Sequence, residues 1–162
     1  DGASGALCHE PAITMDILPT IFEAIGKPLP EAVTSVLDGH SLIPLLKDPK
    51  AKLERKSLFW HYPHYHSMGA QPYSAIRSGN WKLIEVIGQN KIELYDLSSD
   101  IHENNDLART YLDKTKELYF ELANWRKSIG AQMPSANPDF DPEKPTGVSR
   151  KGNIKAAAPL RD

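Results

Sequence analysis

The segment from residue 57 to residue 97 constrains the fold most, because it contains four stretches with strand-like composition in close succession. Strands are predicted over residues 57–62, 74–77, 81–87 and 91–97. The last three are separated only by Ser-Gly-Asn and Gly-Gln-Asn, which are typical of hairpin turns. Strands joined by such short turns are antiparallel. The sequence therefore predicts an antiparallel sheet, in which the continuous apolar and aromatic run 57–62 suits a central strand buried on both faces.

A long helix is predicted after the sheet. From Tyr111 onwards, side chains suited to a buried face recur every three or four positions until Gly130 closes the pattern. Asn104, Asn105 and Asp106 are plausible caps for this segment. The helical stripe needs a partner, and one face of the four-stranded sheet is the obvious one. The predicted fold class is thus α+β, a four-stranded antiparallel sheet with a long C-terminal helix packed across it.

The flanking regions are organised differently. A short helix is predicted from Asp16, its expected N-cap, to Ile25, with Gly26 as the stop. Prolines and turn residues then alternate up to residue 54, and a subdomain boundary is expected near Lys50. Beyond Met133 the chain is rich in Pro, Asn, Asp, Lys and Gly without periodicity, which predicts an extended or mobile tail over residues 134–162.

Composition excludes some partners. The 19 basic and 21 acidic residues give a net charge of −2, so no basic field of the kind that nucleic acid or an anionic membrane requires is expected. No apolar run approaches the roughly 18 residues of a membrane span. Cys8 is the single cysteine and forms no intrachain disulfide. The chain opens on Asp-Gly-Ala-Ser-Gly-Ala, which suggests a fragment or a processed piece.

Three histidines follow one another around the end of the first predicted strand. His61, His64 and His66 have the spacing H-x2-H-x-H, which could bring two or three imidazoles to a zinc ion. The alternative for His61 is a hydrogen-bonded structural histidine inside a buried strand. His64 follows Pro63, where a side chain is well placed to face a ligand as a hydrogen-bond donor.

Other polar residues have ordinary interpretations beside functional ones. Arg77 could clamp a carboxylate or sulfate, or pair with Asp96 or Glu93 across the sheet, and we favour the pairing. The acidic side chains around Asp100 lack the spacing of a calcium-binding EF-hand loop, which favours a solvated turn. No complete catalytic set is recognised.

Several short motifs occur in a characteristic order. They are Asp16-x-x-Pro19-Thr20-Ile21, Asp38-Gly39-x-Ser41-Leu42, Phe59-Trp60-His61-Tyr62-Pro63, Ala75-Ile76-Arg77-x-Gly79-x-Trp81-Lys82-Leu83-Ile84 and Glu93-Leu94-Tyr95-Asp96-Leu97. In this order, across roughly residues 9–142, they resemble the C-terminal portion of the type I, formylglycine-dependent sulfatases. The His-Tyr-Pro-His-Tyr variant looks most like the bacterial arylsulfatase-type enzymes that desulfate polysaccharides or glycosaminoglycans.

The resemblance implies three parts. Residues 1–50 would be the end of an alkaline-phosphatase-like α/β catalytic domain, including its last helix, and a connecting segment. Residues 51–133 would be the smaller C-terminal subdomain, and residues 134–162 the tail. In this family the nucleophile is a Cys or Ser of the motif C/S-x-P-x-R, oxidised to formylglycine, and calcium screens the charge. Cys8-His9-Glu10-Pro11-Ala12 does not fit that motif, so the nucleophile, the calcium ligands and the cofactor are expected upstream of Asp1, and no catalytic or metal-binding residue is expected in this chain.

The resemblance also implies a function. The subdomain closes one wall of the substrate pocket in such enzymes, so His64 and, less directly, His61 are expected to bind the sugar or aryl part of a sulfated substrate. The whole enzyme would hydrolyse sulfate monoesters, and this chain alone is expected to be inactive. The implied partners are the upstream catalytic domain and a sulfated small molecule or glycan, and the implied location is periplasmic or secreted.

Without a partner sheet, the first helix would expose Ile17, Ile21, Phe22 and Ile25, which predicts self-association or disorder there.

Three alternative functions stay open. The chain could be a stand-alone carbohydrate-binding or interaction module, or a small zinc protein that uses the three histidines. It could also belong to a phosphoryl-transfer enzyme of the same superfamily.

Overall fold

The structure is a computed structural model that describes residues 5–65 and 71–135. The chain divides into two compact units, Asp1–Arg55 and Lys56–Asp162, which we call the N-terminal unit and the C-terminal unit. His66 and most of the predicted tail, from residue 136 onwards, lie outside the described residues.

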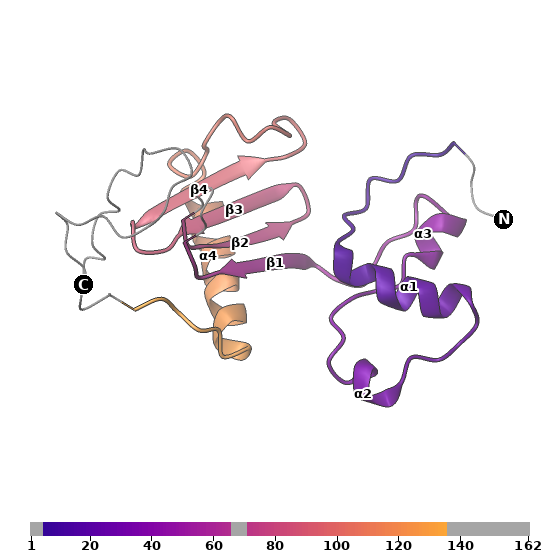
Figure 1. Ribbon diagram of the computed structural model, residues 1–162. Helices are drawn as coiled ribbons and strands as arrows, with labels where there is room; N and C mark the ends of the chain where they lie inside the picture. The colour runs from indigo at the N-terminus through magenta and orange to yellow at the C-terminus, as the bar shows by residue number, and fades with distance from the viewer. Residues whose placement is uncertain (1–4, 66–70, 136–162) are drawn as a thin grey trace, which may run out of the picture. The chain divides into compact units, whose positions relative to one another are not determined.

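The C-terminal unit is built on the predicted antiparallel sheet. Strands β1 (Ser57–Tyr62), β2 (Tyr73–Ser78), β3 (Trp81–Val86) and β4 (Lys91–Asp96) lie side by side in chain order (Figure 1). Gly79 opens the turn between β2 and β3 with a φ of +58°, a left-handed conformation that glycine adopts at little cost. This turn sets the register and places Arg77 opposite Lys82. The prediction of a four-stranded antiparallel sheet is confirmed.

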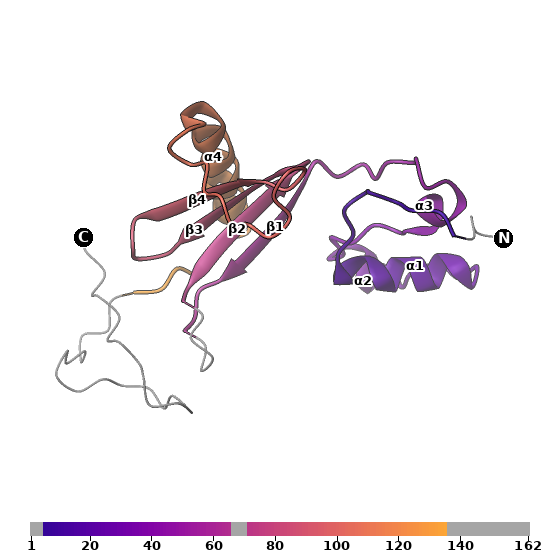
Figure 2. The same ribbon diagram turned by 90° about the horizontal axis from the view of Figure 1, so that it is seen from above.

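One face of the sheet is covered by helix α4 (Leu112–Ser128), which lies on one side of the strands in Figure 2. Because successive strand residues point to opposite faces, every second side chain of each strand is directed toward α4. These side chains and the inner face of α4 form a single apolar core. Its buried members are Ile76, Leu83, Leu94, Ala108, Leu118 and Leu122. The predicted α+β fold, with the long helix packed across the sheet, is confirmed.

Strand β1 lies at the edge of the sheet, so its prediction as a central strand buried on both faces is wrong. It pairs with β2 on one side, and β4 forms the opposite edge of the sheet. Leu58 is buried, whereas the aromatic residues of β1 are half-buried. Phe59 stacks on Trp125 of α4, with 4.7 Å between the ring centroids. The aromatic run therefore reflects rings that shield a sheet edge and not a second neighbouring strand.

The predicted caps of α4 have a different role. Asp106 accepts hydrogen bonds from the backbone N–H groups of Leu94 (3.0 Å) and Ala108 (2.9 Å). Its carboxylate thus ties the turn before α4 to strand β4, and α4 begins several residues later, at Leu112. The prediction of Asp106 as a helix cap is therefore wrong, because a strand N–H competes for the same carboxylate.

The buried stripe of α4 is shorter than the sequence periodicity. Leu118 and Leu122 are fully buried, but Tyr111 and Ile129, at the two ends of the predicted stripe, are 48% and 54% exposed. The helix packs against β2 and β3, and its buried residues Leu118, Leu122 and Arg126 lie between these exposed ends. Gly130, with a φ of +61°, follows the helix end as predicted.

The N-terminal unit contains short helical elements joined by extended segments. They are η1 (Thr14–Asp16), α1 (Ile17–Ala24), α2 (Glu31–Thr34) and α3 (Ile43–Lys47). Helix α1 is the predicted short helix, and Gly26 follows it in a left-handed conformation with a φ of +65°. Asp16 occupies the predicted N-cap position of α1, but its fully buried carboxylate makes no capping hydrogen bond to the first turn and instead accepts the N–H of Ile13 at 2.9 Å.

Helix α1 presents apolar side chains to solvent within its own unit. Ile17, Leu18, Ile21 and Ile25 are between 41% and 61% exposed. Self-association through this face stays a prediction. In the described part of the chain, no helix combines the length and the apolar character needed to cross a membrane.

Candidate functional site

The predicted histidine cluster lies at the end of β1. His61 belongs to the strand and points to the face that α4 covers, as does its cross-strand partner Ser74. His64 follows Pro63 in the loop beyond the strand and is exposed. The third predicted member, His66, lies outside the described residues.

The imidazole of His61 has a hydrogen-bond partner at each nitrogen. Its Nδ1 lies 2.8 Å from Ser74 Oγ, and its Nε2 lies 2.7 Å from the backbone carbonyl oxygen of Gln132, in the segment that follows α4. Arg126 donates from Nη1 to the same Ser74 hydroxyl at 3.2 Å and forms an ion pair with Glu85 at 2.6 Å. Ser74 and Arg126 are buried, so His61 belongs to a polar network between the sheet and α4.

His64 is the more accessible of the two described histidines. Its ring meets the ring of Tyr62 edge to face, with 5.6 Å between the centroids. Tyr62 in turn lies beside Tyr73 of β2, at 5.9 Å. His64 therefore stands at the strand end, next to aromatic rings of the face that α4 leaves open, as the sequence placed it.

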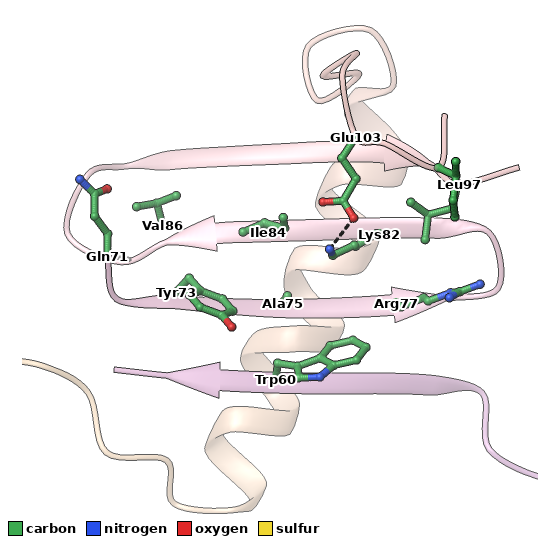
Figure 3. Close-up of a pocket in the computed structure, with 11 residues that line it drawn as sticks. Trp60, Gln71, Tyr73, Ala75, Arg77, Lys82, Ile84, Val86, Leu97 and Glu103 are labelled. Carbon is green, nitrogen blue, oxygen red and sulfur yellow. Dashed lines mark hydrogen bonds and ion pairs between the residues drawn. The ribbon is translucent and has the colours of Figure 1, made fainter. Parts of the chain in front are cut away.

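The open face of the sheet forms a concavity of about 660 Å³ (Figure 3). Its floor is apolar and aromatic, and cationic side chains lie at one end. The lining residues are Trp60, Gln71, Tyr73, Ala75, Arg77, Lys82, Ile84, Val86, Leu97, Ile101 and Glu103. This surface was not predicted from the sequence. The signal for it was the Ser-Gly-Asn turn, which fixes the register and brings Arg77 and Lys82 to one face of the sheet.

Charge in the concavity is partly balanced. Lys82 donates to Glu103 at 2.6 Å, as the dashed line in Figure 3 marks. Arg77 donates from Nε to the carbonyl oxygen of Gly79 at 3.2 Å, and the expected pairing with Asp96 or Glu93 is not observed in the part of the chain that the structure describes. Lys82, on β3, stands between Arg77 and the strand that carries both acids.

Tyr95 extends the row of side chains that begins at Arg77 and Lys82, because it lies opposite Lys82. Burial, together with the nearby carboxylates of Glu93 and Asp106, raises the pKa of Tyr95 to about 12. The phenol is therefore neutral at physiological pH and acts as a hydrogen-bonding group.

A second polar centre lies in the N-terminal unit, at Asp16. Its carboxylate receives two hydrogen bonds from Arg55, at 2.6 and 2.7 Å, and further bonds from the backbone N–H groups of Ile13 and His40. Burial alone would raise the pKa of Asp16, but the Arg55 guanidinium and these N–H groups outweigh it and lower the pKa to about 2. We call this set the Asp16 centre.

Two sequence motifs meet at the Asp16 centre. The hydroxyl of Thr20 donates to the carbonyl oxygen of Asp16 at 2.6 Å and accepts from the N–H of Leu42 at 2.8 Å. A Cβ added to Gly39 would lie 2.0 Å from the carbonyl oxygen of Met15, so only glycine fits there. The residues of Asp16-x-x-Pro19-Thr20 and Asp38-Gly39-x-Ser41-Leu42 thus hold the backbone together.

The described residues do not fit a formylglycine and calcium centre. Both oxygens of Asp16 are engaged by Arg55 and backbone N–H groups, which leaves no lone pair directed at a cation. Glu10, next to Cys8-His9, is bonded to Lys52 and to the N–H of Leu53. Within residues 5–65 and 71–135, no three His, Cys, Asp or Glu side chains converge on a point where a metal ion could sit. This includes His61 and His64, while the zinc alternative also involves His66.

Comparison with known proteins places most of the chain in one family. Residues 4–128 match the family described as N-sulphoglucosamine sulphohydrolase, C-terminal. A sulfatase from Formosa agariphila is 29% identical over 156 residues, which cover 92% of this chain and 27% of that protein. Human arylsulfatase A is 40% identical over 149 residues, which cover 79% of this chain and 28% of that protein.

Solved structures share the fold. One, described as a complex with its substrate D-glucosamine-2-N,6-O-disulfate, matches with a TM-score of 0.58 and 28% identity, covering 74% of this chain and 24% of that chain. This chain therefore spans about a quarter of the length of these relatives.

Proposed function

We infer that this chain, which belongs to the N-sulphoglucosamine sulphohydrolase C-terminal family, is the C-terminal portion of a longer sulfatase. The observation that carries the proposal is the family match over residues 4–128, together with the sheet and helix of the C-terminal unit. The chain spans 27% of the Formosa agariphila sulfatase, so the remaining part would supply most of the enzyme.

The proposal assigns the chemistry to the part outside this chain. The formylglycine nucleophile and the calcium ligands would lie upstream, in a motif C/S-x-P-x-R and its surroundings. Such an enzyme hydrolyses a sulfate monoester by attack of the formylglycine hydrate on sulfur. Residues 1–50 would complete the catalytic α/β domain, and residues 51–133 would form the C-terminal subdomain beside the substrate pocket.

A sulfated glycan is the proposed substrate class. The solved relative that carries D-glucosamine-2-N,6-O-disulfate supports a sulfated amino sugar. His64 is the proposed substrate contact, because its exposed imidazole can donate to or accept from a sugar hydroxyl. His61 is the second proposed contact, although a substrate oxygen would first have to replace the Gln132 carbonyl at Nε2.

The main proposed partner is the upstream catalytic domain of the same protein. The exposed Ile17, Leu18, Ile21 and Ile25 of α1 form an apolar face that this domain would cover, and in its absence self-association is expected. A periplasmic or secreted location belongs to the same proposal.

Two measurements test the proposal. The purified chain is expected to show no turnover of an aryl sulfate, and measurable turnover would overturn the placement of the nucleophile outside it. A chimera that carries this chain in place of the matching part of the Formosa agariphila sulfatase is expected to hydrolyse an aryl sulfate. His64→Ala in that chimera is expected to raise KM for a sulfated sugar more than it lowers kcat, with Lys116→Ala, at an exposed position of α4, as the control.

A second function is favoured by the open concavity. Trp60 and Tyr73 offer rings on which a sugar can stack, and Arg77 offers a fork for a sulfate group. As a stand-alone binding module, the chain would melt cooperatively and bind a sulfated oligosaccharide, with affinity lost in His64→Ala. Calorimetry with heparin oligosaccharides and their desulfated counterparts separates this function from that of an inactive enzyme portion, which would bind neither.

A further inference from the structure

The polar network around His61 has a direction that fixes where its protons lie. An arginine side chain only donates, so Ser74 Oγ accepts the hydrogen bond from Arg126. The one proton of the Ser74 hydroxyl is then free to be donated to His61 Nδ1, 2.8 Å away. This contact is compatible with Nδ1 as an acceptor, but the second lone pair of Ser74 Oγ could equally accept from Nδ1–H, so this end alone does not fix the tautomer.

The other end of the network decides the assignment. A carbonyl oxygen only accepts, so the 2.7 Å contact between His61 Nε2 and the carbonyl oxygen of Gln132 requires a proton on Nε2. In a neutral ring this is the Nε2–H tautomer, in which Nδ1 accepts from the Ser74 hydroxyl. In this tautomer each residue donates a hydrogen bond to the next, from Arg126 to Ser74, from Ser74 to His61 and from His61 to the Gln132 carbonyl.

This line joins three parts of the C-terminal unit that are distant in sequence. Glu85 on β3 holds Arg126 on α4 by an ion pair, and the side chains of both are at most 18% exposed. Ser74 is fully buried on β2, and His61 lies opposite it on the edge strand β1. Six residues after Arg126, the backbone carbonyl of Gln132 joins the same network. The end of α4 is therefore fixed on both sides of its C-terminal glycine turn.

We propose that His61 is a positioning residue that latches the segment after α4 to the end of β1, through its Nε2–H and the Gln132 carbonyl. Gln132 carries no side-chain role in this latch, since its backbone oxygen is the acceptor. If the proposed function holds, the latch also steadies the strand end from which the loop with His64 departs. While the Gln132 carbonyl is bonded to Nε2, His61 would hold the backbone and His64 would face the substrate, and a substrate contact of His61 would require this bond to open.

Two substitutions of His61 separate the two ends of the latch. The side-chain amide of His61→Asn ends near the position of Nδ1, so its oxygen accepts from Ser74 but nothing reaches Gln132. The longer amide of His61→Gln ends near the position of Nε2 and can donate to the Gln132 carbonyl. Both variants are neutral and polar, and both lose the same ring.

Nuclear magnetic resonance of the whole 162-residue chain gives the test. Long-range nitrogen–proton spectra of the His61 ring are expected to show protonated Nε2 and unprotonated Nδ1 at neutral pH. The backbone heteronuclear NOE of residues 131–133 is expected to fall in His61→Asn and to stay near the wild-type value in His61→Gln. Amide exchange of β3 and β4 serves as the check that the sheet remains folded.

Several outcomes would overturn the latch. They are an Nδ1–H tautomer, unchanged order of residues 131–133 in His61→Asn, or equal loss of order in both variants. If both variants fail to fold, the wild-type chain keeps the test, because an Nδ1–H tautomer or low heteronuclear NOE values at residues 131–133 would overturn the latch. No substrate is used, so failure of the latch leaves the sulfatase proposal intact, and failure of the chimera assay leaves the latch intact.

Discussion

The two units of this chain are held together by different forces. In the C-terminal unit, six buried apolar residues form a single core between the sheet and the helix. In the described part of the N-terminal unit, Leu45 and Pro19 are the buried apolar residues, while Asp16 is completely buried with its charge. A domain of ordinary size relies on apolar burial, so the N-terminal unit resembles a piece of a larger interior that is organised locally by the Asp16 centre.

The difference predicts which unit fails when a given contact is removed. The C-terminal unit carries its own core and should fold alone. The N-terminal unit depends on one buried carboxylate and its partners, so it should be lost separately. Four changes test this contrast, in order of decreasing expected effect.

Asp16→Asn is expected to unfold the N-terminal unit and spare the C-terminal unit. The substitution leaves the Arg55 guanidinium buried without its anion, at a cost of about 3–5 kcal/mol. Site-resolved amide exchange should show lost protection across residues 13–25 and unchanged protection in β2 and β3. Loss of protection in both units together would mean that they form one cooperative unit.

Leu122→Ala is the reverse experiment. Leu122 is fully buried in the apolar core, and its truncation is expected to cost about 3 kcal/mol through lost contacts and a cavity. Urea denaturation followed by Trp fluorescence measures the loss, because Trp81 and Trp125 pack against this core. The hydrogen bonds of Asp16, followed by the exchange of the His40 amide, should persist. The matched control is Phe120→Ala, also on α4 but 63% exposed.

Acid is expected to act mainly on the N-terminal unit. The pKa of Asp16 is lowered from 3.8 to about 2, so its contribution to stability is complete above roughly pH 5 and is lost as the pH falls through about 2. The difference amounts to about 2 kcal/mol. Between pH 4 and pH 2, circular dichroism and amide exchange should report loss of α1 before loss of the sheet. A sheet that melts first would contradict the contrast.

Glu10→Gln is expected to have the smallest effect, although it also removes an ion pair of the N-terminal unit. Its partner Lys52 is 77% exposed, so solvent screens the pair and the loss should stay below about 1 kcal/mol. Thermal melts of this variant beside Asp16→Asn compare an exposed with a buried ion pair. If Glu10→Gln lowered stability as much as Asp16→Asn, the number of ion pairs, and not their burial, would determine the stability of the N-terminal unit.

The sheet and the long helix were predictable because their signals are local. Alternation, the Ser-Gly-Asn turn and the spacing before Gly130 each depend on residues close together in sequence. The position of β1 was not predictable in this way, because an aromatic edge strand shielded by Trp125 has the same composition as a central strand. Likewise, the exposure of Tyr111 and Ile129 depends on which residues of the folded unit lie next to them, which is a tertiary property.

The residues of the candidate site likewise differ in how well the sequence predicts them. His64 could be placed at a strand end from Pro63 alone. The partners of His61 could not be foreseen, since Gln132 lies 71 residues away and contributes a backbone oxygen that has no sequence signature. The carboxylate of Asp16 was predicted to accept a first-turn N–H, because Asp at the start of a helix usually does so. Here it accepts hydrogen bonds from Arg55, 39 residues away, instead.

The separation of Asp16 and Arg55 also has a consequence for biosynthesis. The carboxylate leaves the ribosome 39 residues before the guanidinium that neutralises it. Until Arg55 is synthesised, the Asp16 centre lacks the guanidinium that donates two of its hydrogen bonds. The N-terminal unit can therefore complete this centre only after translation has reached its last residue, Arg55, which lies just before β1.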